Sequence, residues 1–222
     1  MAISKDKKKA IDAIMGKINK QFGENATTYL ADVYEDLKIK FWKTPSHEVN
    51  SMLDGGLAKG KIIELYGQNS SGKTSLALEV IAKAQREDPD FMAAWVETEG
   101  SLDSDYLATM GIDMDRFIIV EQTEELTAEK CMDIIRSLVN SKQFGIICLN
   151  SVAALVPSKE IEDELGKQNI ALTARLLSKF LRITSASLAT SGTSLILINQ
   201  VRQNLGAYIV TATTTGKILI SV

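Results

Sequence analysis

The sequence is poor in the residues that build metal centres and covalent cross-links. It has a single histidine, His47, which leaves no basis for a histidine-rich metal site or a Ser–His catalytic pair. It has two cysteines, Cys131 and Cys148, and both fall within apolar periodic segments. They are therefore predicted to be buried thiols of a reducing compartment, not a disulfide or a metal site.

Long apolar runs and an excess of charge of one sign are also missing. No run approaches membrane-spanning length, and the lysine-rich N-terminus lacks the apolar core of a signal peptide. These features predict a soluble, cytoplasmic protein without membrane partners. The net charge of −3 gives no global basic signature, so any nucleic-acid contact must come from local cationic groups. A length of 222 residues suits one α/β domain with a short extension.

One motif is specific enough to predict a ligand. A strand-like run at 61–66 leads into a helical stretch at 74–86, and the connection has the pattern G-x-x-x-x-G-K-[ST]. A phosphate-binding loop requires this strand–loop–helix order, whereas a Gly-rich turn that matched by chance would not have both flanks. The residues predicted to contact a nucleotide are Gly67, Gln68, Asn69, Ser70, Ser71, Gly72, Lys73, Thr74 and, at the start of the helix, Ser75.

Each part of this loop has a chemical task. Its glycines let backbone N–H groups close around phosphate oxygens, and the N-terminus of the following helix adds a favourable dipole. Lys73 would reach the β- and γ-phosphates, and the Thr74 hydroxyl would bind Mg²⁺. The loop therefore predicts a site for a nucleoside triphosphate with its magnesium ion.

Short apolar strands alternate with amphipathic helices from residue 61 onward. This alternation predicts an α/β fold in which a mostly parallel sheet is covered by helices on both faces. The predicted strands are 61–66, 91–96, 117–120, 145–149 and 194–198, with a further strand within 217–222, and the predicted helices are 74–86, 104–110, 127–140 and 170–188.

An amphipathic helix is predicted ahead of this domain. Residues 4–22 place apolar side chains on one stripe among lysines, with Ser4 as the N-cap and Gly23 as the stop. The stripe must be buried either against the chain's own core or against a neighbouring subunit, and its spacing favours neither. We expect residues 1–35 to form this helix and a linker, and residues 36–222 to form the core.

Polar residues follow the predicted strands at their carboxyl ends, where a parallel sheet forms its ligand crevice. Glu97 and Glu99 close the 91–96 strand, and either could position a water molecule or be a solvated loop acid.

Asn150 follows the 145–149 strand, where an aspartate would hold Mg²⁺ through water. An amide brings no charge, so weaker metal binding is expected. Alternatively, Asn150 caps the following turn. Gln200 ends the last clear strand and could sense a terminal phosphate.

Two long polar connections, 157–169 and 202–216, leave the same edge, and connections of this length are usually functional or disordered. Arg175, Ser178 and Arg182 share one face of the helix predicted at 170–188. Taken alone, that face is a solvated surface more readily than a binding surface.

Several of these features together resemble the RecA family of bacterial and phage recombinases, in order and over almost the whole chain. The matching segments are Lys7–Gly23, Gly55-Gly56-Leu57, Glu64–Gly67, Ser70–Thr74, Glu97-Thr98-Glu99, Leu102-Asp103 with Tyr106, Asn150–Leu155, Glu160-Ile161-Glu162, Ile198–Arg202 and Thr213–Gly216.

The resemblance implies an ATP site and a role for each residue at its edge. Glu99 would be the catalytic carboxylate that activates the attacking water, with Lys73 on the phosphates. Asp103 and Tyr106 would contact the adenine, Tyr106 by stacking. Gln200 would couple the γ-phosphate to the DNA-binding loop that begins at Arg202.

The resemblance also implies partners. The connections 157–169 and 202–216 would be DNA-binding loops, supported by Arg175, Ser178 and Arg182, with Gly216 near a backbone contact to DNA. The N-terminal helix would dock on the next subunit and build a helical filament, a heterologous contact that does not close. Such a filament would hold single-stranded DNA and pair it with a homologous duplex.

Three departures from the family pattern favour an alternative as well. Asn150 replaces an aspartate, Lys217 follows Gly216 where a second glycine is usual, and the chain stops at Val222, before the family's remaining core strands and C-terminal domain. The expected DNA-dependent ATPase and recombinase therefore stands beside a rival, a regulator or filament cap that binds nucleotide without productive turnover. Another phosphate-loop ATPase, such as a ring helicase, would explain only the nucleotide site.

Overall fold

The computed structural model describes residues 3–35, 38–121, 123, 125–162, 170–200 and 219–221. Its internal contacts divide the chain into two units, Met1–Ile39 and Lys40–Val222. This division falls four residues beyond the expected boundary at residue 35. Within the described part of the chain, no helix is both long and apolar enough to cross a membrane.

The first unit contains the expected amphipathic helix, α1 (Lys5–Phe22), and a short helix, α2 (Leu30–Val33). Ser4 caps α1, because its Oγ accepts the Lys7 N–H at 3.4 Å, and Gly23 ends the helix with a φ of 112°. Both predicted boundary residues are confirmed. Every α1 residue retains solvent exposure within this unit, and Phe22 at its end is 71% exposed.

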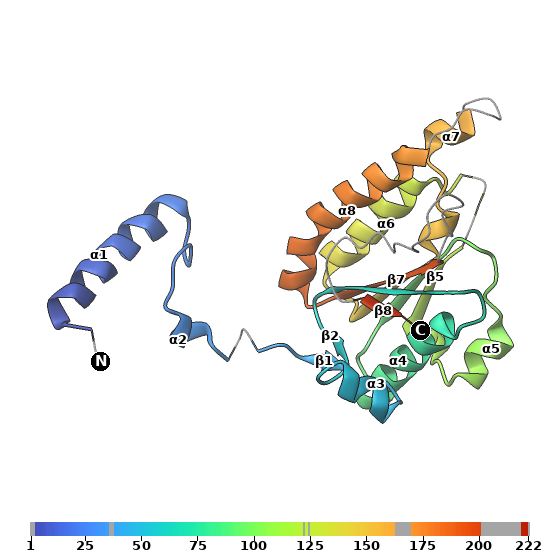
Figure 1. The fold of residues 1–222 in the computed structure, drawn as a ribbon, viewed down its shortest axis with the longest axis horizontal. Coiled ribbons are helices and arrows are strands. Elements are labelled where there is room, and N and C mark those ends of the chain that lie inside the picture. The colour runs from blue at the N-terminus through green and yellow to red at the C-terminus, as the bar shows by residue number, and fades with distance from the viewer. Residues whose placement is uncertain are drawn as a thin grey trace, which may run out of the picture. The chain divides into compact units, whose positions relative to one another are not determined.

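The second unit is built on one sheet, in which the described residues form six parallel strands in the order β5-β4-β6-β7-β3-β8 (Figure 1). The strand bounds are β3 Ile62–Gly67, β4 Ala93–Glu97, β5 Phe117–Val120, β6 Ile146–Asn150, β7 Ser194–Gln200 and β8 Leu219–Ser221. The predicted strands are confirmed with shifts of one or two residues at most ends. A separate antiparallel pair joins β1 (Phe41–Trp42) to β2 (Leu57–Ala58).

Helices cover both faces of this sheet, as the alternating pattern predicted (Figure 1). On β4, Ala93 and Trp95 face one hydrophobic cluster with α4 (Lys73–Glu87), whereas Ala94 and Val96 face a second cluster with α6 (Ala128–Ser141) and α8 (Ile170–Ser191). The helix bounds are α3 His47–Met52, α4 Lys73–Glu87, α5 Ser104–Thr109, α6 Ala128–Ser141, α7 Ser158–Glu162 and α8 Ile170–Ser191, with 3-10 turns η1 Met114–Arg116 and η2 Val152–Ala154.

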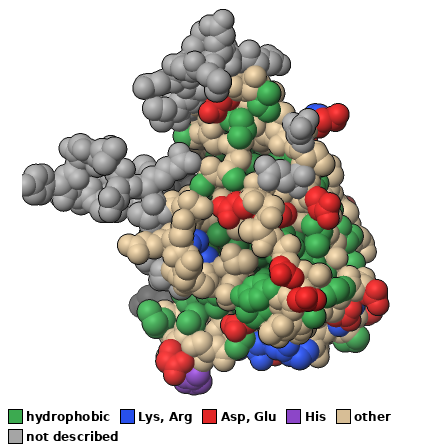
Figure 2. Space-filling view, turned by 90° about the vertical axis from the view of Figure 1, so that its right-hand side faces the viewer, with side chains coloured by type: hydrophobic (Ala, Val, Ile, Leu, Met, Phe, Trp, Pro, Cys, Tyr) green, Lys and Arg blue, Asp and Glu red, His purple; other side chains and the backbone are tan. Residues whose placement is uncertain are grey.

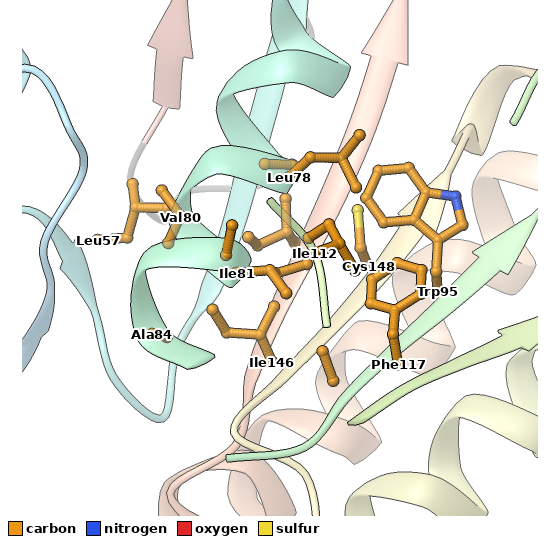
Figure 3. Close-up of a cluster of buried hydrophobic side chains, with 14 of the residues drawn as sticks. Leu57, Leu78, Val80, Ile81, Ala84, Trp95, Ile112, Phe117, Ile146 and Cys148 are labelled. Atoms are coloured by element: carbon orange, nitrogen blue, oxygen red, sulfur yellow. The ribbon is translucent and has the colours of Figure 1, made fainter. Parts of the chain in front are cut away.

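The α4-side cluster packs α4 against one face of the central strands. Figure 3 shows Leu78 and Ile81 of α4 turned toward Trp95, Phe117 and Cys148, which come from three neighbouring strands. The rings of Trp95 and Phe117 lie 6.1 Å apart between centroids. This packing holds β4, β5 and β6 together, and polar side chains follow the carboxyl ends of β4 and β6.

The order of the strands determines where a ligand crevice forms. The chain leaves β3, passes through α4 and returns as β4 three positions away in the sheet, with β7 and β6 between them. A crossover of this kind opens a crevice beyond the carboxyl ends of the intervening strands. The connection that follows β3 stands at this crevice.

The two cysteines are buried, as the sequence predicted. Cys131 on α6 and Cys148 on β6 are both free thiols with no exposed surface. Burial raises the pKa of Cys131 to about 12. Burial, and next the charge of the Glu97 carboxylate, raise the pKa of Cys148 well above its ordinary value.

These thiols should react with a disulfide reagent only when the chain unfolds. Their unfolded pKa is about 8.5, so the unfolded state releases protons first and the free energy of unfolding should fall as pH rises above about 8.5. The measurement is the rate of thiol labelling at neutral pH, with and without concentrated guanidinium. Rapid labelling of either thiol in the native chain would contradict its placement.

Candidate functional site

The predicted phosphate loop joins β3 to α4 in a conformation that leaves the helix start open. Gly67 ends β3 and α4 begins at Lys73. The residue before the helix, Gly72, is left-handed with φ 86°, and no side chain caps the α4 N-terminus. The first N–H groups of a long helix are therefore available to an anion.

Lys73 is a buried cation that the loop itself surrounds. Its side chain is 7% exposed, and its Nζ donates to the carbonyl oxygens of Gln68 at 2.6 Å and Gly67 at 3.3 Å. A third, longer bond at 3.4 Å reaches Ser71 Oγ. All these acceptors are uncharged, and among the described ion pairs none includes Lys73. An unpaired cation next to an uncapped helix start fits a phosphate group.

The first turn of α4 lies against α5, the helix that carries the residues expected at the adenine. Ser75 Oγ and Tyr106 Oη lie 2.6 Å apart, and Tyr106 is 36% exposed. Asp103 is the N-cap of α5, where its Oδ1 accepts the Asp105 N–H at 2.7 Å. Tyr106 therefore lies beside the loop, one hydrogen bond from the turn that also contains Thr74.

Side chains from the ends of β4 and β7 meet next to this loop. Gln200 Nε2 donates to Glu99 Oε1 at 3.0 Å, and Gln200 is the register partner of Gly67 on β3. Ser151 Oγ, which follows β6, also donates to Glu99 Oε1. The structure thus brings two predicted residues, Glu99 and Gln200, into direct contact.

Asn199 holds the end of β7 in place. Its Nδ2 donates to Glu64 Oε1 on β3 at 2.8 Å, and its Oδ1 accepts the Gln200 N–H at 2.9 Å. Sequence reasoning missed the contacts of Ser151 and Asn199, although both adjoin a residue that it singled out. The position of each at a strand end was the available signal.

Glu97 is buried, so the alternative that it is a solvated loop acid is wrong. Its side chain is 3% exposed, and its Oε2 accepts from Trp95 Nε1 at 3.0 Å and from Asn150 Nδ2 at 3.1 Å. Its Oε1 accepts the Glu99 N–H at 2.7 Å. Asn150 is thus a donor to a carboxylate, a role that neither sequence alternative contained. Its assignment to the metal stays a prediction.

Among the described residues, no cluster of three or more His, Cys, Asp or Glu side chains is arranged to hold a metal ion. A hollow of about 720 Å³ lies beside Glu97, between the ends of β4 and β5 and the start of α5. No residue of the phosphate loop lines it. The hollow is therefore separate from the loop.

The residues expected to bind DNA are only partly described. Arg175, Ser178 and Arg182 are exposed on α8, on the face turned away from the buried Phe180 and Leu188. Neither arginine forms an ion pair with a described residue. Arg202, Gly216 and the connection 202–216 lie outside the described residues, as do 163–169 of the other connection.

A glycine-rich loop with a buried lysine, at the crossover of a parallel sheet covered on both faces, defines a phosphate-loop α/β fold. Within that class, a family model described as the RecA N-terminal domain matches residues 9–220. The chain belongs to the RecA family.

Curated relatives agree with this assignment. Protein RecA of Synechococcus elongatus is 38% identical over 216 residues, which cover 97% of this chain and 59% of that protein. Protein RecA of Nostoc punctiforme is 38% identical and that of Paenarthrobacter aurescens 39%, each over 97% of this chain and 60% or 61% of theirs. The chain therefore spans about six tenths of the length of these relatives.

The left-handed conformation at Gly72 has a measurable cost for any other residue. A Cβ added there meets nothing within 4 Å, so Gly72→Ala should lose about 1–2 kcal/mol through backbone strain alone. Gly192, with φ 73° and equally open surroundings, is the matched control and should lose a similar amount. Urea unfolding measures both. A fully stable Gly72→Ala variant would contradict the described loop conformation.

Proposed function

We propose that this chain is an ATP-dependent, single-stranded-DNA-binding recombinase that forms a filament and promotes homologous pairing and strand exchange. The observation that carries this proposal is the hydrogen bond between Glu99 and Gln200 at the mouth of the phosphate loop. It joins the carboxylate expected to activate water to the strand end from which the expected DNA-binding loop departs, at Arg202. Hydrolysis and DNA contact would be coupled through this pair.

The loop is suited to the triphosphate of ATP. Its residues Gly67, Gln68, Asn69, Ser70, Ser71 and Gly72 would present backbone N–H groups, and Lys73 would exchange its carbonyl partners for phosphate oxygens. Mg²⁺, held by Thr74 and through water by Asn150, would offset charge on the transferred phosphoryl group. Asp103 and Tyr106 would contact the adenine, since Tyr106 already adjoins Ser75.

Glu99 would act as the general base. Both described bonds to its carboxylate, from Ser151 and Gln200, fall on Oε1. They orient the carboxylate while Oε2 is left to accept a proton from water. Gln200 would report the state of the terminal phosphate through the same bond.

DNA would be held by local contacts, since the chain has a net charge of −3. On the face shown in Figure 2, acidic side chains are dispersed and basic ones occupy a few small spots. Arg175, Ser178 and Arg182 on the exposed face of α8 would supply phosphate contacts, together with Arg202 and Gly216.

The first unit would provide the contact between subunits. The apolar stripe of α1 has no core of its own, and it ends in an exposed Phe22. Docked on the next copy of the chain, it would generate a helical filament of the cytoplasm by a contact that does not close.

One observation favours a second candidate, a regulator or filament cap that binds nucleotide but turns it over poorly. An uncharged amide, Asn150, stands where the metal would be anchored, and its Nδ2 is engaged by Glu97. Hydrolysis stimulated by single-stranded DNA would separate the two candidates, because only the recombinase requires it.

Two substitutions test the roles in hydrolysis. Lys73→Ala should abolish ATPase activity and weaken ATP binding while the fold survives, because its partners are loop carbonyls.

Glu99→Gln should retain ATP binding and lower turnover by about 100-fold or more, because the base is removed but its shape is kept. The measurements are steady-state ATPase with single-stranded DNA and binding of a fluorescent ATP analogue.

An unchanged rate in Lys73→Ala would refute the assignment of the loop. Loss of ATP binding in Glu99→Gln would show that Glu99 is structural. If the unmodified chain binds ATP without hydrolysing it, the regulator is the better description.

The arginines of α8 are tested by the salt dependence of DNA binding. Removing both Arg175 and Arg182 should weaken single-strand affinity and make the dependence of log K on log salt shallower by about 1–1.5 units, since fewer counterions are released. Arg136→Ala on α6, which removes an exposed arginine paired with Asp133, is the control. An unchanged slope in the double variant would place these arginines on a solvated face.

A further inference from the structure

The fold buries two charged side chains among the described residues, and they are Lys73 and Glu97. Lys73 belongs to the phosphate loop, whereas nothing in the proposed hydrolysis yet uses Glu97. A carboxylate removed from water is costly unless it is paired or fully hydrogen-bonded. Glu97 forms no ion pair with a described residue. Its burial therefore rests on hydrogen bonds alone.

Three neutral donors surround this carboxylate, two from its own segment of the chain and one from β6. Trp95 Nε1 comes from the same strand, and Asn150 Nδ2 comes from the register partner of Glu97 on β6. Both bind Oε2, whereas Oε1 accepts the backbone N–H of Glu99 at 2.7 Å. Oε2 is thus held by two buried side chains, whereas Oε1 binds the backbone of Glu99, the residue expected to activate water.

Further hydrogen bonds tie the same segment to β6. The Thr98 N–H donates to the Asn150 carbonyl at 2.7 Å, and Thr98 Oγ1 donates to the Ser151 carbonyl at 2.9 Å. The backbone from 97 to 99 is therefore held against 150 and 151 at several points. Among the described hydrogen bonds, only the one that Glu97 Oε1 accepts involves the Glu99 N–H.

We propose that Glu97 is a positioning residue for hydrolysis, which sets the direction of Glu99 through its backbone N–H, and that Asn150 serves as the neutral donor that this buried carboxylate requires. The inference rests on the proposed function of Glu99. It gives Asn150 a task that an aspartate could not perform, because a second carboxylate would face Glu97 Oε2 across a separation of 3.1 Å. Asn150→Asp alone should therefore lower turnover, although the sequence suggested that a charge there would help the metal.

Exchanging the carboxylate of residue 97 with the amide of residue 150 should have a different effect from either single substitution. In Glu97→Gln, an amide nitrogen on the side of Trp95 and Asn150 would lose two bonds, whereas one on the side of Glu99 loses only the bond from the Glu99 N–H. The second orientation is therefore favoured, and it leaves the Glu99 N–H without its acceptor. In Glu97→Gln combined with Asn150→Asp, the glutamine oxygen can keep the Glu99 N–H while its nitrogen donates to the new aspartate. The charge then lies on β6, and only the Trp95 N–H loses its acceptor.

The first test is steady-state ATPase of both single variants and the double variant, with Glu121→Gln at the exposed end of β5 as the matched control. Each single variant should lower kcat about 10- to 100-fold while KM for ATP changes by less than about threefold, since misplacement of the base affects the chemical step. The double variant should recover to within about tenfold of the unmodified chain. Equal loss of kcat and ATP affinity, or additive losses in the double variant, would overturn the proposal.

Hydrogen exchange of the Glu99 amide, followed by NMR, tests the same bond without activity. Exchange should become at least about tenfold faster in Glu97→Gln and stay unchanged in Glu121→Gln, because only the first removes its acceptor. Unchanged exchange would overturn the positioning role even if hydrolysis is confirmed. Absent hydrolysis with accelerated exchange would instead refute the proposed function and leave the bond established.

If Glu97→Gln does not fold, Trp95→Phe is the substitute, because it removes one of the two donors to Oε2. It should accelerate exchange of the Glu99 amide less strongly, and no acceleration would again contradict the inference.

Discussion

The parallel register of four strands determines which polar side chains meet at the carboxyl edge of the sheet. It pairs Gly67 with Gln200 and Glu97 with Asn150, so the ends of β3, β7, β4 and β6 reach one edge of the sheet. A shift by one residue would turn every side chain on a strand to the opposite face. The phosphate loop, the expected base and the expected phosphate sensor come together because hydrophobic clusters on both faces of the sheet fix this register.

Two buried charges of opposite sign give this edge its chemical character. Lys73 rests on uncharged acceptors of its own loop, and Glu97 rests on uncharged donors of the sheet. Neither is neutralised by an ion pair with a described residue. In the proposed site the cation would exchange these uncharged acceptors for phosphate, whereas the anion accepts three hydrogen bonds and would fix the backbone at Glu99. Lys73 is thus suited to binding an anion, and Glu97 is suited to positioning the backbone of Glu99.

The sequence predicted the fold well because its signals are local. Strand and helix periodicity, the Ser4 cap, the Gly23 stop and the burial of Cys131 all follow from nearest neighbours along the chain. The state of Glu97 could not be predicted, because its burial depends on an indole from one strand and an amide from the next. For Asn150, the residue type alone suggests a turn cap or a ligand of a metal-bound water. In the fold its side chain instead donates a hydrogen bond to Glu97, which is 53 residues away in the sequence. Similarity to RecA proteins establishes the family of the chain, but it gives no information on the hydrogen bond between Glu97 and Asn150.

The carboxyl edge of the sheet is proposed to be a single nucleotide site. Hydrogen–deuterium exchange of the unmodified chain, with and without Mg²⁺ and a non-hydrolysable ATP analogue, tests it most directly. We expect protection in peptides that contain the loop 67–75, the segment 97–106 and the end of β7 at 199–200, with little change in α6. Protection limited to the loop, or absent from it, would contradict the claim that these residues form one site.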